Sequence, residues 1–375
     1  MSNDSKYLED GVNVQLGDEF SSLCAKICRE SYNNSPYVKV LDLAKGNFRG
    51  PRGFVLQNLP EGCILTAVCD GVGTKVIPIV ASGKIKNTPD DVIAMTAMDI
   101  TRYGGLPLIF MNILDVHSLN ETEKVRYAEM MNGLAEIAKE HSYVVLGGET
   151  AELGACVGSE DPEAKLKFNL GGFMIGAYHP DRMIDGSTLD SGQVVVALRE
   201  NGFRSNGLSS VRKAFRLKYG DDWFNNPAAK EDLFLATVPS VQYDRFLNHL
   251  NGWNEKNKRL VKLHLIAHLT GGGFETKFGE VVSRAGFSAD LDNLFYPPEI
   301  MEKCANWRGL SEKEFYSTWN GGQGALVVLD KKDVDTFFHY SKKFNISARI
   351  AGRIIKKEGY SVRIKSRFLG SDILF

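Results

Sequence analysis

The chain has 375 residues, of which 43% are hydrophobic and 24% are charged, a composition typical of a folded globular protein large enough for two domains. Its 45 basic and 46 acidic residues leave a net charge of −1, which argues against a nucleic-acid partner or an anionic membrane partner. From the polar opening MSNDSKYLEDG we expect no secretory signal, and no apolar run approaches the roughly 20 residues of a membrane helix. We therefore expect a cytoplasmic protein. Its six cysteines include no CxxC pair and are expected to be reduced.

The first half of the chain predicts alternating helices and strands. Residues 18–33 have helical apolar spacing, with Asp18 as the expected cap. A loop or edge strand follows, and then CILTAVC, at 63–69, predicts a buried strand that runs into DGVGTK. Further on we expect a helix from Thr88-Pro89 to Gly104-Gly105, a long helix from Asn120, and strands at 107–113, 143–148 and 168–178.

The polar, turn-rich segment 179–193 predicts a domain boundary, which divides the chain into residues 1–180 and 181–375. The second part has predicted strands at 194–198 and 324–330, and two Gly-bearing turns that each open a helix. Strands alternating with helices predict an α/β protein with mixed sheets.

Polar side chains follow the strands of the first domain. Asp70 follows the first strand, Asn112 lies near the end of the second and Glu149 follows the third, while Asp99 lies near a helix end. Polar residues at strand ends commonly line a ligand crevice, and carboxylates together with phosphates are suitable ligands for Mg²⁺. A shared Mg–ATP site is one interpretation, and solvated loop acids are the other.

Three glycine-bearing turns are candidate phosphate sites. In DGVGTK, the backbone N–H groups beside Gly71 and Gly73, the Thr74 hydroxyl and the Lys75 ammonium can all face phosphate. This is not a Walker A loop. The turns at 205–207 and 270–273 precede helices, where free N–H groups bind anions, although ordinary helix capping explains each turn equally well.

In chain order, six motifs resemble those of the aminoimidazole ribonucleotide synthetase family. They are YLEDGVNVQLGD (7–18), DGVGTK (70–75), GGETAE (147–152), SNG…VRK (205–213), HLTGGGF (268–274) and YSTWNGGQG (316–324). The resemblance spans nearly the whole chain. It implies a two-domain ATP-dependent synthetase fold whose N-terminal domain pairs with a second copy to form a barrel shared by a homodimer.

The resemblance also implies that ATP and Mg²⁺ are used to close the imidazole ring of formylglycinamidine ribonucleotide. ATP would phosphorylate the formyl oxygen, and a neighbouring nitrogen would then displace phosphate. The residues implied for ATP are Asp70, Gly71, Gly73, Thr74, Lys75, Gly147, Gly148, Glu149 and Thr150. Those implied for the substrate phosphate are Arg204, Ser205, Asn206, Gly207, Thr270, Gly271, Gly272 and Gly273. The expected metal ligands are Asp70, Asp99 and Glu149, and the expected catalytic residues are Lys75, Asp99 and His268.

The chain departs from the family pattern at three places. Arg204 replaces a usual His before SNG, Asn112 replaces a usual Asp, and Gln323 is inserted among the glycines of the late loop. Because guanidinium cannot exchange protons, we expect Arg204 to bind phosphate. His268 is either a proton shuttle or a structural residue. No role is predicted for the tail after the last motif.

Two other hypotheses remain open. The first is another ATP-dependent enzyme of the same superfamily. The absence of Cys from residues 40–55 weighs against selenophosphate synthetase, and HLTGGG weighs against thiamine monophosphate kinase. The second is a catalytically inactive nucleotide-binding regulatory protein.

Overall fold

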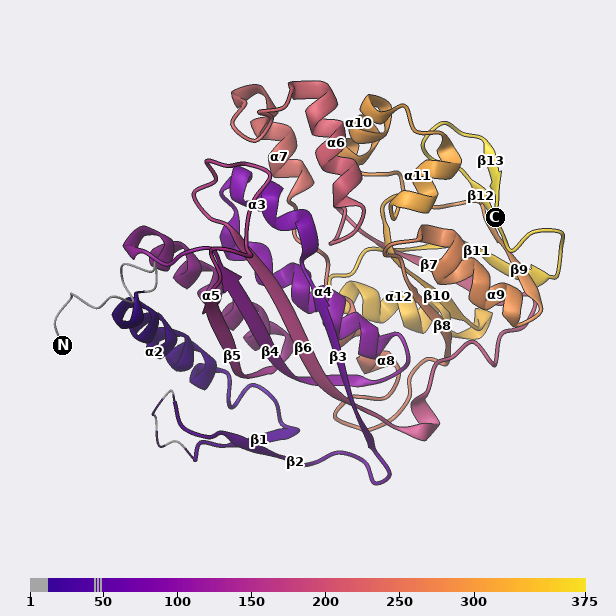
Figure 1. The fold of residues 1–375 in the computed structure, drawn as a ribbon. Coiled ribbons are helices and arrows are strands. Elements are labelled where there is room, and N and C mark those ends of the chain that lie inside the picture. The colour runs from indigo at the N-terminus through magenta and orange to yellow at the C-terminus, as the bar shows by residue number, and fades with distance from the viewer. Residues whose placement is uncertain (1–12, 44, 46, 48) are drawn as a thin grey trace. The chain divides into compact units, whose positions relative to one another are not determined.

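The computed structural model describes residues 13–43, 45, 47 and 49–375, so part of the opening motif, residues 7–12, lies outside the described residues. The chain forms two compact units (Figure 1). Unit 1 runs to Thr96 and includes Pro107–Ala177, and unit 2 combines Ala97–Leu106 with Tyr178–Phe375. The expected mixed α/β class is confirmed. Across the described ranges, no helix is both long and apolar enough to span a membrane.

Unit 1 is built on a four-stranded sheet with the strand order β3-β6-β4-β5 (Figure 1). Strands β4 and β5 are parallel, and β1 and β2 form a separate antiparallel pair. Its elements are α2 (Val14–Glu30), β1 (Val38–Leu41), β2 (Gly53–Leu56), β3 (Ile64–Gly71), η1 (Gly73–Lys75), α3 (Val76–Ser82), η2 (Ile85–Asn87), α4 (Thr88–Thr101), β4 (Leu106–Val116), α5 (Glu121–His141), β5 (Val144–Glu152) and β6 (Phe168–Tyr178).

One face of this sheet is covered by helices. On β6 the side chains of Phe168, Leu170 and Met174 are buried, whereas Phe173 is 39% exposed on the opposite face. The Phe168 ring packs edge-on against Tyr127 of α5 at 5.8 Å. Successive side chains of a strand point to opposite faces of the sheet. Within unit 1, one face of β6 therefore packs in the core and the other is partly exposed.

Three local predictions for unit 1 are wrong. The cap of α2 is Asn13, whose side chain accepts from the Leu16 amide, while Asp18 pairs with Arg49 instead. Strand β3 is not buried, because it is an edge strand whose Ile64 and Leu65 side chains are 58% and 57% exposed. Strand β5 does not end before Glu149 but runs on to Glu152, so that GGETAE lies within the strand.

Unit 2 contains a seven-stranded sheet with the order β13-β12-β9-β11-β7-β10-β8. Its elements from Tyr178 onward are η3 (Pro180–Arg182), β7 (Val194–Arg199), α6 (Leu208–Tyr219), η4 (Pro227–Ala229), α7 (Lys230–Ala236), α8 (Asp244–Leu250), β8 (Leu263–His268), the π-helical turn η5 (Glu275–Gly279), α9 (Glu280–Arg284), β9 (Phe287–Leu291), α10 (Glu299–Arg308), α11 (Glu312–Thr318), β10 (Gln323–Leu329), η6 (Lys331–Asp333), α12 (Val334–Lys343), β11 (Ala348–Lys356), β12 (Val362–Lys365) and β13 (Asp372–Leu374).

The second half of α4 belongs to unit 2 although it lies far from the rest of that unit in the sequence. Met98 is fully buried in the hydrophobic core around β7, β8 and β10. The Trp253 indole donates to the Gly104 carbonyl at 2.8 Å. These contacts hold residues 97–106 in unit 2.

The pairing of the seven-stranded sheet brings several loops to one end. Strand β10 is antiparallel to both β7 and β8, so the segment before β10 lies beside the segments that follow the other two strands. Strand β11 is antiparallel to β7 and β9, and β12 is parallel to β9. The turns at 205–207 and 270–273 therefore leave the same end of the sheet as the glycine loop 320–323.

Candidate functional site

Unit 1 has a cavity of about 350 Å³ that is lined in part by the GGET residues of the GGETAE motif. Helix α2 forms one wall and β5 another. The residues that line it are Ser21, Cys24, Ala25, Cys28, Arg49, Arg52, Asn112, Met131, Gly147, Gly148, Glu149 and Thr150. The four β5 residues predicted to bind ATP are therefore gathered in one cavity, whereas DGVGTK does not line it.

Asn112 of β4 and Gly148 of β5 are register partners in this cavity. The Asn112 side chain is 4% exposed, and its Oδ1 has no hydrogen-bond partner among the described residues. A Cβ on Gly148 would lie only 2.5 Å from that oxygen, so glycine is required for the close approach. Asn112 therefore presents a buried acceptor in the cavity wall, and a ligand donor could satisfy it.

The charged side chains that line this cavity are Arg49, which is paired with Asp18, together with Arg52 and Glu149. Burial raises the pKa of Cys28 to about 11 and raises the pKa of Cys24 further still. Both thiols are therefore protonated at neutral pH, and α2 contributes a neutral wall. An anionic ligand would be attracted by the arginines rather than by the cysteines.

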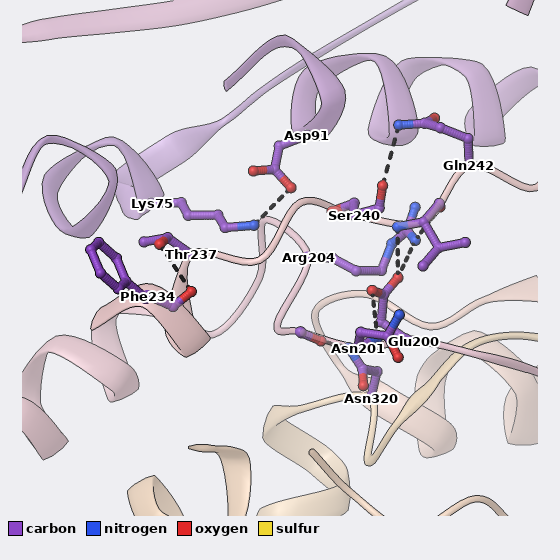
Figure 2. A network of polar contacts seen from close by, with 12 residues as sticks. Lys75, Asp91, Glu200, Asn201, Arg204, Phe234, Thr237, Ser240, Gln242 and Asn320 are labelled. Carbon is purple, nitrogen blue, oxygen red and sulfur yellow. Dashed lines mark hydrogen bonds and ion pairs between the residues drawn. The ribbon is translucent and has the colours of Figure 1, made fainter. Parts of the chain in front are cut away.

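The DGVGTK turn follows β3 and is fixed by its own side chains. The Asp70 carboxylate accepts from the Gly71 amide at 2.7 Å, and Gly73 adopts a positive φ of 61°. Thr74 is exposed. Lys75 is fully buried, and its ammonium donates to Asp91 of α4 at 2.7 Å (Figure 2). The positive charge expected near phosphate is thus already paired with a buried carboxylate.

The three expected metal ligands do not form one cluster. Asp70 lies on β3 and Glu149 on β5, at opposite edges of the four-stranded sheet. Three strand spacings of about 4.8 Å separate those strands by roughly 14 Å. Asp99 belongs to unit 2, where it pairs with Arg102 at 3.4 Å. Among the residues that the structure describes, no group of three or more His, Cys, Asp or Glu side chains is placed to hold a metal.

The two turns of unit 2 that are predicted to bind phosphate pack against each other and against α11. A Cβ on Gly271 would lie 3.3 Å from Asn206 Oδ1, and one on Gly273 would lie 2.0 Å from the Tyr316 carbonyl. Gly207, with φ 68°, is the N-cap of α6, and its carbonyl accepts from the Trp319 indole at 3.3 Å. The structure therefore brings the predicted turns together, with Gly271 and Gly272 exposed and Thr270 9% exposed.

The Arg204 side chain lies beneath the first turn and is not exposed on it. Its guanidinium donates to Glu200 at 2.6 Å and to the Val241 carbonyl at 3.0 Å, and both charged side chains are fully buried (Figure 2). Arg204 also adopts a positive φ of 55°, which is uncommon for a residue with a side chain. In this conformation the guanidinium faces a carboxylate of its own chain. The sequence predicted that Arg204 binds phosphate, and it gave no sign that Glu200 is its buried partner.

The Ser205 hydroxyl oxygen and Nε2 of His268, both next to these turns in the sequence, have no hydrogen-bond partner among the described residues. His268 is 1% exposed at the end of β8, and burial together with the charges of Arg204, Arg102 and Lys277 holds its pKa well below the usual range. His268 is therefore a neutral imidazole at physiological pH.

Gln323 has a contact that its place in the sequence did not suggest. Its fully buried side-chain oxygen accepts from the Phe295 amide at 2.6 Å. The inserted residue therefore ties the glycine loop to the loop after β9, so it is more than a variation in loop length. Only the pairing of distant strands, which is not visible in the sequence, could have indicated this contact.

The fold and these turns define a two-unit α/β protein whose second unit carries two packed glycine-bearing turns, each ahead of a helical segment. Residues 53–177 match the family profile described as AIR synthase related protein, N-terminal domain, and residues 190–365 match the C-terminal domain of the same family. The chain belongs to the AIR synthase related family.

Similar proteins extend over nearly the full length. The chain is 28% identical to phosphoribosylformylglycinamidine cyclo-ligases of Prochlorococcus marinus, over 94% of this chain and 95% of the relative, and of Staphylococcus aureus, over 96% and 98%. Among solved structures, thiamine-monophosphate kinase from Stenotrophomonas maltophilia matches with a TM-score of 0.59 at 14% identity, covering 91% of this chain and 95% of that one. HypE from E. coli, a hydrogenase maturation protein, matches with a TM-score of 0.56 at 15% identity, covering 94% and 95%. At such identities the structures share only the fold.

Proposed function

We propose that the chain is an ATP-dependent cyclo-ligase that closes the imidazole ring of formylglycinamidine ribonucleotide. The observation that carries this proposal is the similarity to curated cyclo-ligases over at least 94% of both chains. The family's motifs supply the matching geometry, because SNG and TGGG pack together and GGET lines a cavity.

The proposed reaction has two steps. The formyl amide oxygen attacks the γ-phosphorus of ATP, ADP leaves, the amide nitrogen loses its proton, and an iminophosphate forms. The neighbouring nitrogen then attacks the formyl carbon, the C–O bond breaks, orthophosphate leaves with its electron pair, and the nitrogen loses a proton. Positioning and electrostatic stabilisation suffice for such a transfer, so no enzyme nucleophile is required.

We assign the nucleotide to the cavity of unit 1. Gly148 provides close access to the backbone, Asn112 Oδ1 is an acceptor in need of a donor, and Arg49 and Arg52 provide positive charge. ATP-bound HypE has a similar fold, with a TM-score of 0.54 at 13% identity, covering 92% of this chain and 90% of that chain.

We assign the ribonucleotide phosphate to the turns of unit 2. Exposed Gly271 and Gly272 leave backbone amides accessible, and the facing turn contains Asn206 and the Ser205 hydroxyl, for which the described residues supply no hydrogen-bond partner. Arg204 is proposed to hold this turn from beneath, through its pair with Glu200. Lys75 is proposed to fix the DGVGTK turn in a similar way, through Asp91.

His268 is proposed to take part as a neutral imidazole. Its pKa lies well below the usual range, so it cannot supply a proton as an imidazolium near neutral pH. The unpartnered Nε2 can instead accept or donate one hydrogen bond, depending on its tautomer. A role as a neutral hydrogen-bonding group near the turn follows.

Mg²⁺ would screen the phosphate charges of ATP when bound. The described residues do not fit a single site for it, because Asp70 and Glu149 lie on opposite edge strands and Asp99 is paired with Arg102. The three carboxylates remain predicted ligands.

A homodimer is also proposed. Strand β3 is an edge strand of the four-stranded sheet and has exposed Ile64 and Leu65, and β6 exposes Phe173. Exposed apolar edge strands of this kind tend to pair with another chain. Pairing with a second copy would cover them.

Purified protein tests the proposed activity. ADP release should require formylglycinamidine ribonucleotide and should not be supported by thiamine monophosphate. Release with thiamine monophosphate alone would reassign the chain within its superfamily, and nucleotide binding without turnover on either compound would favour a regulatory protein.

A further inference from the structure

Three arginines, two on strands and one in the segment after a strand, meet at the end of the seven-stranded sheet that carries the glycine turns. Arg199 is the last residue of β7. Arg349, near the start of β11, pairs with Ala197 and therefore shares a sheet face with Arg199, two residues farther along β7. Arg367 follows β12, which is parallel to β9. The loop after β9, residues 292–296, leaves the same end.

This loop holds all three guanidinium groups. Arg199 and Arg349 both stack on the Phe295 ring, with Cζ at 5.4 and 4.7 Å from its centroid, and Arg367 Cζ lies 5.3 Å from the centroid of Tyr296. Arg349 donates to the Leu294 carbonyl at 3.1 Å. Arg367 donates to Asn293 at 3.0 Å.

No carboxylate within the described ranges forms an ion pair with any of these arginines. Glu200, which follows Arg199, bonds to Arg204 instead. The Asp292 backbone carbonyl accepts from Arg367 at 3.3 Å, but its exposed carboxylate is not bonded to the cluster. Burial and the charge of Arg349 lower the pKa of Arg199, as expected for like charges held close together.

The cluster is held in place before any ligand binds. Gln323 fixes the Phe295 amide, and the Arg367 amide donates to the Tyr316 hydroxyl at 2.9 Å. Tyr296 adds an aromatic ring that is 60% exposed. Like charges held together this way are destabilising by themselves, and a bound anion would offset that repulsion. Guanidinium groups bind phosphate oxygens through forked hydrogen bonds.

We propose that Arg199, Arg349 and Arg367 form an anion site, separate from the glycine turns, that binds a phosphate dianion. The phosphate has two possible sources, the phosphomonoester of a ribonucleotide or free orthophosphate. The first source rests on the proposed function, whereas the site itself does not. Arg367 lies past the matched family range of 190–365, so this site gives the tail a role.

Calorimetric titration of the full chain with ribose 5-phosphate and with inorganic phosphate tests the proposal without requiring turnover. Arg349→Gln should raise Kd at least tenfold for whichever ligand binds the wild type, and Arg349→Lys should recover part of the loss. The control is Arg353→Gln, which removes the same charge from an exposed position of the same strand and should change Kd less than twofold. Circular dichroism confirms that each variant is folded.

Tighter binding of ribose 5-phosphate identifies a phosphomonoester site, and equal or tighter binding of inorganic phosphate identifies an orthophosphate site. No binding of either ligand by the wild type at 20-fold the protein concentration and above would overturn the proposal. So would equal Kd values for Arg349→Gln and Arg353→Gln, or a loss of binding in Asn206→Ala alone, which would move the anion to the glycine turns. Lost ring closure with intact phosphate binding would contradict the proposed function and not this site.

Discussion

At the scale of single residues, the candidate sites depend on close contacts that only a few side chains permit. A Cβ on Gly148 would clash with Oδ1 of Asn112. The Arg204 guanidinium was expected to contact a phosphate ligand, but it is paired with the buried Glu200 carboxylate. In both cases the neighbour across the fold determines what the residue can do, and its type alone does not.

Gly148→Ala should destabilise unit 1 by about 1–3 kcal/mol, because the new methyl group is forced into the Asn112 side chain. Urea unfolding measures the change, and Gly171→Ala is the control, since a Cβ there meets nothing within 4 Å. Asn112→Ala combined with Gly148→Ala should recover stability. Equal effects of the two single glycine substitutions would contradict the contact.

Arg204→Ala should lower the free energy of unfolding by about 3–5 kcal/mol, because it leaves the buried Glu200 carboxylate without its cation. Replacing both residues, Arg204→Met with Glu200→Gln, should recover at least half of that loss. Arg216→Ala removes an exposed guanidinium, 46% exposed in its pair with Asp221, and should cost less than about 1 kcal/mol. A stable Arg204→Ala protein with a raised KM would favour the phosphate contact instead.

The pH dependence of stability should reflect the neutral state of His268. An unfolded histidine takes up a proton below about pH 6.5, whereas burial and nearby cations prevent this in the folded state. The unfolded state then binds more protons, so the free energy of unfolding falls as the pH falls below about 6.5. His268→Gln should reduce this fall by about 1 kcal/mol between pH 7.5 and 5.5. The exposed His339→Gln is the control, and an unchanged fall in His268→Gln would count against a neutral imidazole.

At the scale of elements, β3 carries the clearest difference between sequence and structure. The apolar, β-branched run at 63–69 predicts a buried strand. In the structure, however, Ile64 and Leu65 at the start of β3 are 58% and 57% exposed. A strand buried by a second chain has the same pattern as one buried by its own chain. Sequence alone therefore cannot tell the two apart.

Ile64→Asp with Leu65→Asp should convert a dimer into monomers, because two carboxylates on the edge strand would oppose pairing. Sedimentation velocity at micromolar concentration measures this. The control is Leu217→Asp on α6, whose side chain is similarly exposed at 59%. A monomeric wild type, or a variant that still dimerises, would exclude β3 as the interface.

Regular elements with strong local signals were predictable. Asn120 caps α5 with a capping box to Glu123, and the turns at 205–207 and 270–273 precede helical segments as expected. The extent of β5 through GGETAE was not predicted, because two glycines and two glutamates oppose a strand and only pairing with β4 overrides them.

At the scale of the whole molecule, the order of motifs along the chain predicted the family and the two-part α/β architecture. It did not predict that residues 97–106 pack with unit 2, or that Arg199, Arg349 and Arg367 meet around one loop. Both follow from pairing between segments distant in sequence. The distance between Asp70 and Glu149 within one chain also depends on the order of the strands in the sheet. The spacing of motifs along the sequence does not reveal that order.

The stoichiometry of a single reaction tests the proposed ring closure most directly. Wild-type protein should convert formylglycinamidine ribonucleotide and ATP into one aminoimidazole ribonucleotide, one ADP and one phosphate, measured together by chromatography and by diazotisation of the new amine. ADP formation without the imidazole product, or no ADP with a protein shown to bind ATP, would contradict the proposed ring closure.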